Sequence, residues 1–353
     1  MDSIADLVSG LVKEGFTHTF GKPSHTVLAD PIWQKVCDTG TRLWLDTGDI
    51  DVAKSLWNSS FSALTTNNTL LNREVQKGIY DELIPRTVGA IRESEPDIDE
   101  KTLVLETAFV LNATHALRLV ETFDVSVSVE LHTDLAEDIE RTVSYGKRYF
   151  AICPERFIVK VPLTPQGYLA ARKLVQAGVP INFTLGFSAR HNVAAARIAN
   201  TDYVNVFMGR LNSFVANHGL GSGENVGEKA TLATQRALIK LREAGRSKTM
   251  LIGASMREGG QVSDLAGLDV FTMPPAAAEQ YHAAPDDAIQ SRIKNDPSIT
   301  LADGVDASDF YASSLWDVPE AFESCLDALS DDMLDAMDGP ALQAHFAAHG
   351  FLD

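Results

Sequence analysis

The chain of 353 residues is 45% hydrophobic and 22% charged, a composition typical of a globular protein with enough apolar residues for a core. Its net charge of −18 argues against nucleic acid or an anionic membrane as the main partner, because an acidic surface repels both. No stretch reaches the roughly 18 consecutive apolar residues of a membrane span, the N-terminus lacks a signal-peptide pattern, and the three cysteines have no metal or redox spacing. We therefore expect a cytoplasmic protein with unpaired thiols.

Short apolar runs rich in β-branched residues follow one another along the chain, and helical patterns separate them. The predicted strands are residues 42–46, 62–67, 126–131, 157–162, 180–187, 203–209, 249–255 and 269–275. The clearest helical patterns occupy residues 99–123, 164–178, 188–200 and 228–245. Asp99 is the predicted N-cap of the first of these helices, and Thr164 with Pro165 starts the second. The long connection between the second and third strands has room for two helices.

Strands that alternate with helices predict a parallel sheet, and eight of them predict an α/β fold with a single (β/α)8 TIM barrel. An open, doubly wound sheet is the alternative architecture. Within one domain, residues 1–40 would form a helical extension and residues 41–307 the barrel. Residues 308–353, which have an acidic amphipathic pattern, would form additional C-terminal helices.

Polar residues stand near the C-terminal ends of five successive predicted strands, where the active sites of such barrels lie. They are Asp46, Asn67, Glu130, Lys160, Asn182 and Thr184. Each alone has an ordinary structural explanation, such as a cap or turn for Asp46 and Asn67, or an ion pair for Lys160. Because the barrel would bring all of them to one face, together they predict a functional site.

Lys160 is unusual because it lies between Val159 and Val161 in an apolar strand. A buried ammonium is costly, so a lysine in this position needs a use or a partner. A dry wall formed by these valines would help to keep its amine neutral, and a neutral amine can attack a carbonyl to form a Schiff base.

The other polar residues fit an aldol reaction around such a Schiff base. Glu130, through a water held by Thr184, could move the protons that imine formation requires. Asp46 could take the proton of a substrate hydroxyl so that the adjacent C–C bond breaks, while Asn67 and Asn182 bind sugar hydroxyls. Because the imine accepts the electron pair, we expect neither a metal nor an organic cofactor.

Other chemistries have weaker support. The glycine-rich stretch 219–230 lacks the spacing of a nucleotide-binding loop. The preferred interpretation is a mobile loop before a helix, with a place beside the substrate as one option. The histidines are scattered without a metal-binding motif, a nucleophile elbow is missing, and Cys153 has no identifiable partner. A catalytically inactive scaffold would have no reason to retain Lys160, Asp46 and Glu130 together.

Seven segments in order carry a family resemblance: LWLDTGDID, TTNNTLL, SVSVE, FIVKVPLTPQG, INFTLGFS, FMGRL and GASMR. They resemble the transaldolase family, Schiff-base-forming class I aldolases on a (β/α)8 barrel, and the likeness covers roughly residues 42–275. The resemblance implies that Lys160 forms the Schiff base, that Asp46 is the acid/base for C–C cleavage, and that Glu130 with Thr184 forms the water-mediated proton relay.

The resemblance also implies a pocket for a sugar phosphate. Asn67 and Asn182 would hold a dihydroxyacetone unit, Phe207 would form an aromatic wall, and the phosphate would meet Arg210, Ser255 and Arg257. The expected function is that of a transaldolase of the pentose phosphate pathway, which transfers dihydroxyacetone from a ketose phosphate to an aldose phosphate. The alternatives are a fructose-6-phosphate aldolase-like enzyme and a transaldolase for a modified sugar. The oligomeric state stays open, with a homodimer as one option.

Two positions depart from the family pattern. Asn68 stands where the family usually has proline, which should loosen that turn but spare its neighbour. Asn205 stands where the family carries a small serine near the substrate, so it is expected to line the pocket and to alter the preferred chain length or head group.

Overall fold

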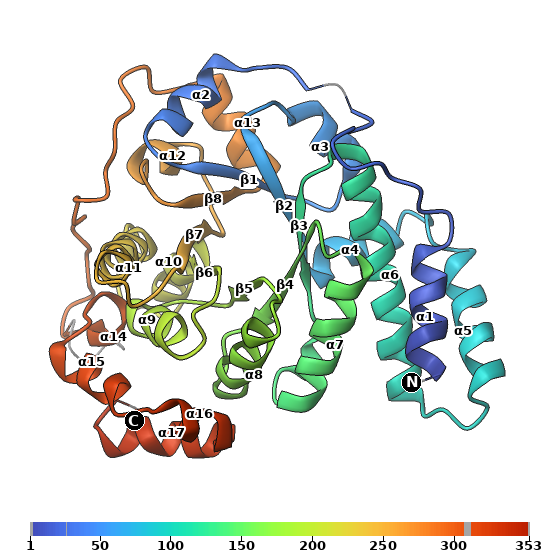
Figure 1. Ribbon diagram of the computed structural model, residues 1–353. Coiled ribbons are helices and arrows are strands. Elements are labelled where there is room, and N and C mark those ends of the chain that lie inside the picture. The colour runs from blue at the N-terminus through green and yellow to red at the C-terminus, as the bar shows by residue number, and fades with distance from the viewer. Residues whose placement is uncertain (1–2, 26, 307–311, 352–353) are drawn as a thin grey trace.

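The computed structural model describes residues 3–25, 27–306 and 312–351, and its centre is a closed barrel of eight parallel strands in sequence order (Figure 1). The strands are β1 (Arg42–Asp46), β2 (Phe61–Thr65), β3 (Ser126–Glu130), β4 (Phe157–Pro162), β5 (Ile181–Thr184), β6 (Tyr203–Phe207), β7 (Met250–Ala254) and β8 (Val270–Met273). The first and last strands pair, with Leu43 opposite Phe271, so the sheet closes on itself. The predicted (β/α)8 barrel is confirmed, and the open sheet is excluded.

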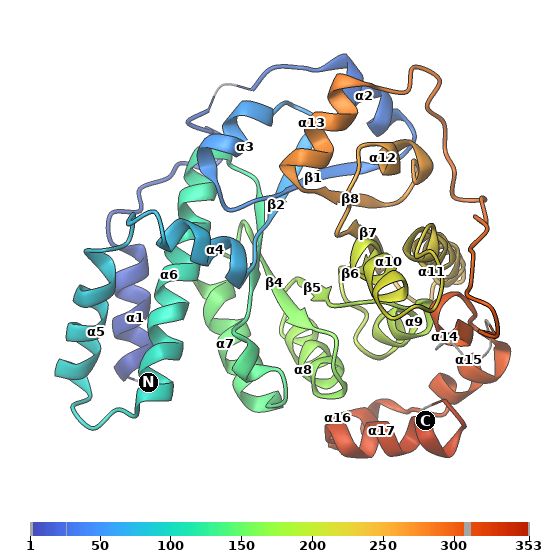
Figure 2. The same cartoon turned by 180° about the vertical axis from the view of Figure 1, so that it is seen from behind.

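Helices surround the barrel on its outside, as the views from both sides show (Figures 1 and 2). Those between the strands are α3 (Ile50–Leu56), α4 (Asn68–Val75), α5 (Leu83–Ser94), α6 (Glu100–Phe123), the 3-10 turn η1 (Thr133–Leu135), α7 (Ile139–Ile152), α8 (Pro165–Gln176), α9 (Ala189–Ile198), α10 (Met208–Asn217), α11 (Val226–Glu243) and α12 (Gly260–Asp264), and α13 (Pro275–Ala283) follows the last strand. As predicted, Asp99 caps α6 and Thr164 caps α8.

The structure differs from the sequence-based expectation in one connection and at one strand end. The segment between β2 and β3 holds three helices, α4, α5 and α6, where two were expected. The predicted strand 203–209 ends at Phe207, because Met208 already begins the helix α10. The short periodic pattern of α10 was missed because it follows the apolar run of β6 without a break.

The strands alternate between the inside and the outside of the barrel. Trp44 and Ile158 belong to a small cluster inside the barrel. Val159 and Val161 belong to the large core between strands and helices. Since successive strand residues point to opposite faces, Lys160 points into the barrel while its two valine neighbours point outward. The expectation that these valines surround the amine is therefore wrong, because they lie on the other face of the strand.

The N-terminal segment contains α1 (Ser3–Lys13), which packs against α5 and α6, and α2 (Pro31–Asp38), which lies near α13 (Figure 1). Among the described helices, α6 alone is long and apolar enough to cross a membrane, but 72% of its apolar window is buried. It is packed as a core helix rather than exposed to lipid.

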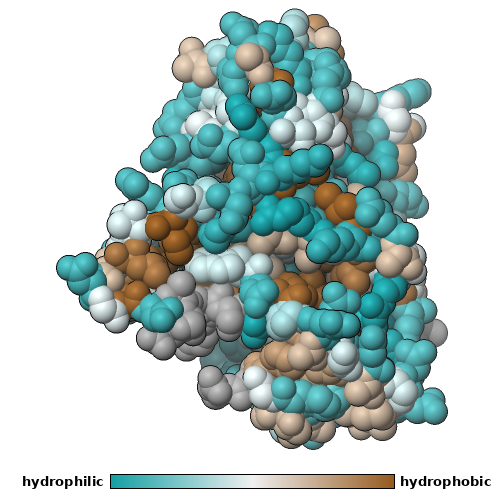
Figure 3. Space-filling model, turned by 90° about the vertical axis from the view of Figure 1, so that its left-hand side faces the viewer, coloured by the Kyte–Doolittle hydropathy of each residue, from teal (hydrophilic) through white to brown (hydrophobic). Residues whose placement is uncertain are grey.

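The C-terminal segment forms α14 (Ala312–Trp316), α15 (Glu320–Asp327), α16 (Asp331–Ala336) and α17 (Gly339–Ala348), and residues 307–311 lie outside the described part. Basic side chains of the barrel helices hold these acidic helices in place. Arg172 of α8 pairs with Asp331 and Asp335, and Arg197 of α9 pairs with Asp327. Seen from the side that α14 and α15 cover, the surface is mostly hydrophilic, with small scattered apolar areas (Figure 3).

Candidate active site

A pocket of about 630 Å³ opens where the strands end. Every predicted site residue lines it: Asp46, Asn67, Glu130, Lys160, Asn182, Thr184, Asn205, Phe207, Arg210, Ser255 and Arg257. These residues come from seven different strands or from the connections that directly follow them. The structure therefore brings the whole set together, although the roles assigned to its members stay predictions.

Lys160 occupies the centre of this arrangement. In the strand register it lies opposite Glu130 on one side and Asn182 on the other. Its ammonium group is buried, donates to the carbonyl oxygen of Thr66 at 3.2 Å, and lies 3.3 Å from Oε1 of Glu130. A carboxylate at this distance can accept a proton from the amine.

Two lysines line the pocket, and their surroundings differ. Lys77 lies near the entrance, half exposed, and its ammonium contacts Asp49 at 2.6 Å and Glu74 at 2.8 Å. The hydrogen bond to Asp49, followed by that to Glu74, raises the pKa of Lys77 and keeps it protonated. Lys160 is the better-placed nucleophile of the two, because its buried amine lies among the strand ends with Glu130 at 3.3 Å, whereas the Lys77 ammonium is half exposed and engaged by two carboxylates.

Asp46 ends β1 and takes part in a chain of hydroxyl groups. Thr65 donates to Oδ1 of Asp46 at 2.7 Å, and its hydroxyl lies 2.6 Å from that of Thr272. Burial raises the pKa of Asp46, and the positive charge of Lys160 opposes that rise. An acid whose pKa lies above its ordinary range is suited to exchanging a proton with substrate.

Glu130 is held from the side opposite Lys160. The backbone N–H of Asn68 donates to Oε2 of Glu130 at 3.0 Å. The side chain of Asn68 donates to the carbonyl oxygen of Leu131 at 3.3 Å and accepts from Asn112 at 3.0 Å. The expectation that Asn68 loosens this turn is therefore wrong. A proline there would lack the N–H that orients Glu130.

The neutral polar residues leave both donor and acceptor groups for a ligand. Oδ1 of Asn67 accepts from Leu70 and caps α4, so its amide nitrogen is the group left for the pocket. Asn182 donates to Ser128 at 3.0 Å. Among the described residues, Oδ1 of Asn182 and Oγ1 of Thr184 are buried without a hydrogen-bond partner. Buried polar atoms without protein partners usually bind water or a ligand.

Two arginines line the pocket from the segments that follow β6 and β7. Arg210 lies in the first turn of α10, with its guanidinium 5.8 Å from the centre of the Phe207 ring. The side chain of Arg257 packs directly against Gly209 in the same turn. A Cβ atom on Gly209 would lie only 2.9 Å from Nε of Arg257. Within the described part of the chain, neither guanidinium has an acidic partner. Two unpaired guanidiniums in a protein with a net charge of −18 indicate an anion site.

Ser255 connects these two arginines to the barrel. It follows β7 with a φ of 61°, which is uncommon for a residue other than glycine. Its carbonyl oxygen accepts from the backbone N–H of Gly209 at 3.1 Å. The strained turn thereby fixes the start of α10 and, with it, Arg210.

Asn205 lines the pocket from β6 and is buried. The side-chain Oδ1 of Asn205 accepts from the backbone N–H of Gly186 at 3.3 Å. The side-chain amide of Asn192 donates to the backbone carbonyl oxygen of Asn205 at 3.1 Å. The side-chain amide of Asn205 is thus anchored to the segment that follows β5. It fills part of the pocket that a smaller residue at position 205 would leave open.

Of the pocket residues that were not identified from the sequence, four carry polar side chains that could matter to the site: Thr65, Thr272, Arg73 and Lys77. Thr272 stands in an apolar strand between Phe271 and Met273, the same signal that identified Lys160, so it could have been found. Arg73 lies on α4 and Lys77 in the turn that follows it, and exposed charged residues at such positions carry no such signal.

The glycine-rich stretch 219–230 does not flank the pocket. Gly221 forms an isolated antiparallel β-bridge with Leu301, and the backbone N–H of Ser222 donates to the carbonyl oxygen of Thr300 at 3.0 Å. The predicted loop before a helix is confirmed, because α11 begins at Val226, but none of residues 219–230 lines the pocket. Because Gly221 has no side chain, its backbone can lie against Thr300 and Leu301.

His115 of α6 supports the loop that follows β1. Its Nε2 lies 2.8 Å from the carbonyl oxygen of Gly48, and its Nδ1 lies 2.8 Å from the hydroxyl of Tyr80. Burial lowers the pKa of His115 to about 4. The neutral ring therefore donates to Gly48 and accepts from Tyr80, and it holds a pocket-lining loop in place.

This histidine should make stability depend on pH. The unfolded chain binds a proton at His115 near pH 6.5 and the folded chain only near pH 4, so acidification in this window favours unfolding. Between about pH 7.5 and about pH 5 we expect His115 to account for a loss of about 2 kcal/mol in the free energy of unfolding. Urea unfolding of the wild type and His115→Asn at both pH values measures this. Equal pH dependence of the two proteins would contradict the prediction.

Comparison with known proteins gives consistent matches. A family model described as Transaldolase/Fructose-6-phosphate aldolase matches residues 43–333. A protein named Transaldolase from Xanthomonas oryzae pv. oryzae is 28% identical over 309 residues, which are 83% of this chain and 94% of that protein. Proteins of the same name from Protochlamydia amoebophila and Prochlorococcus marinus are 27% identical over 254 and 281 residues. These cover 69% and 77% of this chain, and 76% and 83% of those proteins.

Proposed function

The chain belongs to the transaldolase/fructose-6-phosphate aldolase family, and from this premise we propose that it is a transaldolase that acts through a Schiff base on Lys160. It would transfer a dihydroxyacetone unit from a ketose phosphate to an aldose phosphate, as pentose phosphate metabolism requires, in the cytoplasm. The observation that carries the proposal is the buried amine of Lys160, which lies 3.3 Å from Glu130 in a pocket that also contains Asp46.

The first stage is imine formation. Glu130 takes a proton from the ammonium of Lys160, and the neutral amine attacks the C2 carbonyl of the ketose phosphate. The resulting carbinolamine loses its hydroxyl as water, with the proton supplied by Glu130 through a water that Thr184 binds. The unpartnered hydroxyl of Thr184 and the fixed position of Glu130 beside Asn68 support this assignment.

The second stage is cleavage and transfer. Asp46 removes the proton of the C4 hydroxyl, the C3–C4 bond breaks, and its electron pair passes into the imine to give an enamine on Lys160. An aldose phosphate leaves. When a second aldose phosphate binds, the enamine attacks its carbonyl carbon, Asp46 returns the proton to the new hydroxyl, and water releases the longer ketose from Lys160.

The phosphate of either sugar would bind between Arg210 and Arg257. Both guanidiniums line the pocket, and the phosphate would supply the negative partner that the described residues do not. A phosphate held at this end fixes which carbon reaches Lys160, so the arginines set the register of the sugar chain.

Arg257→Ala should weaken the binding of phosphorylated substrates. The loss of charge-assisted hydrogen bonds is expected to raise KM by about 10- to 100-fold with a smaller change in kcat. Steady-state kinetics with fructose 6-phosphate and with unphosphorylated fructose measures the effect, with Arg92→Ala, an exposed arginine on α5, as the matched control. Equal losses on both sugars would argue against a phosphate contact.

The proposal is tested by trapping the imine. The protein is incubated with fructose 6-phosphate, reduced with borohydride and digested, and Lys160 is expected to carry a dihydroxyacetone-derived adduct in the mass spectrum. With erythrose 4-phosphate as acceptor, sedoheptulose 7-phosphate should form. An adduct on any other lysine, or no adduct with any ketose phosphate, would refute the assignment.

The same experiment separates transfer from simple cleavage. The family description includes fructose-6-phosphate aldolase, which makes release of free dihydroxyacetone the alternative outcome. In that case the adduct on Lys160 would form, but the three-carbon unit would appear in solution even when an acceptor is present. The relatives named above all carry the name Transaldolase, which favours transfer.

A further inference from the structure

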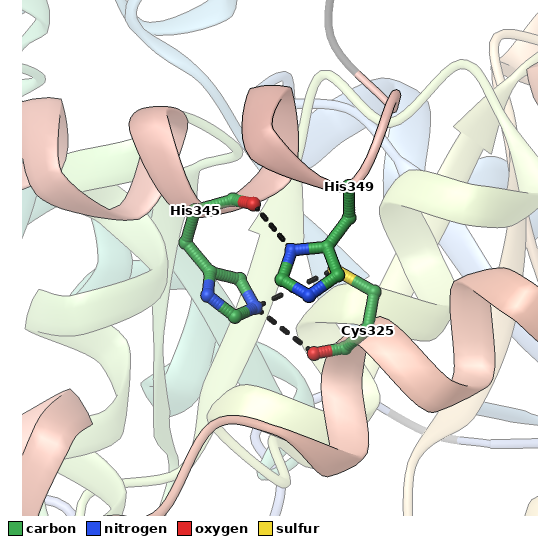
Figure 4. A group of neighbouring side chains, drawn as sticks. All are labelled: Cys325, His345 and His349. Atoms are coloured by element: carbon green, nitrogen blue, oxygen red, sulfur yellow. Dashed lines mark hydrogen bonds between the residues drawn. The ribbon is translucent and has the colours of Figure 1, made fainter.

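Three side chains of metal-binding type meet in the C-terminal helices, outside the pocket described above. Cys325 lies on α15, His345 lies on α17, and His349 is the C-cap residue of α17, one turn further on, with the two rings facing each other beside the cysteine (Figure 4). One ligand atom from each residue lies within 4.8 Å of the other two. Cys325 and His345 are 20 residues apart in the sequence, and only the packing of the two helices brings them together.

The distance between His345 and Cys325 already has the length that a shared metal ion would give. Nε2 of His345 lies 3.4 Å from Sγ of Cys325. With a Zn–S distance of about 2.3 Å and a Zn–N distance of about 2.0 Å, two ligand atoms of a tetrahedral zinc ion lie about 3.5 Å apart.

The two rings are oriented by backbone carbonyl oxygens. Nδ1 of His349 lies 2.8 Å from the carbonyl oxygen of His345, so the tautomer that donates there leaves Nε2 free to bind a metal. Nε2 of His345 also lies 2.9 Å from the carbonyl oxygen of Cys325. For this ring, metal binding requires the other tautomer, in which the proton moves to Nδ1.

The burial of the three groups defines an inner and an outer side. Cys325 is buried, His345 is partly buried, and His349 is exposed. A metal ion held by these residues would have the thiolate behind it and solvent in front, where a water can supply the fourth ligand. A thiolate with two imidazoles favours zinc over magnesium or calcium, and the net charge of −18 attracts cations.

We propose that Cys325, His345 and His349 form a zinc site that fastens α15 to α17. The role is structural, because none of the three lines the pocket. Since α17 packs against α8 and α15 packs against α9, the ion would secure the C-terminal helices on the barrel helices that follow β4 and β5.

The test uses the full chain without an affinity tag that contains histidine. After removal of metals, titration with Zn²⁺ should show one equivalent bound, and Co²⁺ in its place should give a thiolate-to-metal charge-transfer band in the near ultraviolet. Both should be lost in Cys325→Ser and in His349→Ala. The matched control is His218→Ala, because His218 is also exposed at a helix end with Nδ1 2.8 Å from the carbonyl oxygen of Phe214.

The structural role has its own measurement. Zinc should slow hydrogen–deuterium exchange in α15 and α17 of the wild type and of His218→Ala, and leave His349→Ala unchanged. Because His349 is exposed, its replacement should not impair folding, which circular dichroism would verify even if Cys325→Ser failed to fold. The absence of stoichiometric zinc binding, or binding that persists in His349→Ala with the same affinity, would overturn the proposal.

Discussion

Replacement of Lys160 by methionine is expected to abolish turnover while the barrel stays folded. Methionine keeps the unbranched apolar stem and removes the amine that attacks the substrate carbonyl. We expect kcat to fall on the order of 10⁴-fold or more, as it does when a covalent nucleophile is removed. The assay is formation of sedoheptulose 7-phosphate, and borohydride should trap no adduct.

The matched control is Lys77→Met, because Lys77 lines the same pocket. Its ammonium is kept protonated by Asp49 and Glu74, so this variant should still be trapped by borohydride at Lys160. If Lys160→Met retained an adduct, or Lys77→Met lost it, the nucleophile would be assigned to the wrong lysine.

Asp46→Asn should separate imine formation from C–C cleavage. Asparagine has nearly the same shape and can still accept the hydrogen bond from Thr65, but it cannot remove a proton from the C4 hydroxyl. We expect cleavage to slow by about 10²- to 10⁴-fold. Borohydride should then trap the intact ketose phosphate on Lys160 instead of the three-carbon unit. Asp49→Asn, another acidic residue of the pocket, is the control, and undiminished cleavage in Asp46→Asn would refute the role.

The raised pKa of Asp46 predicts two further properties of this residue. Because Asp46 acts as a base only when ionised, the acid limb of the pH–rate profile for cleavage should lie above the ordinary range of an aspartate. The folded state also holds this proton more tightly than the unfolded state, so ionisation at higher pH lowers the stability of the fold. At neutral pH, Asp46→Asn should therefore be at least as stable as the wild type in urea unfolding.

Much of the barrel could be predicted from local sequence. The apolar runs and the caps at Asp99 and Thr164 identify strands and helix starts, because backbone preferences act over a few residues. Strand ends were less certain, and Met208 shows the reason: it continues an apolar run, yet it begins α10. Only the packing of this helix against the barrel decides where β6 stops.

The sequence also identified a set of polar residues that share the pocket, since polar groups at strand ends converge in any barrel of this kind. The tertiary structure decided how each is held. It placed Val159 and Val161 behind the strand rather than beside the amine, and it directed the backbone of Asn68 to Glu130. The meeting of Cys325 with His345 likewise depends on helix packing, because contacts between distant segments leave no local pattern to recognise.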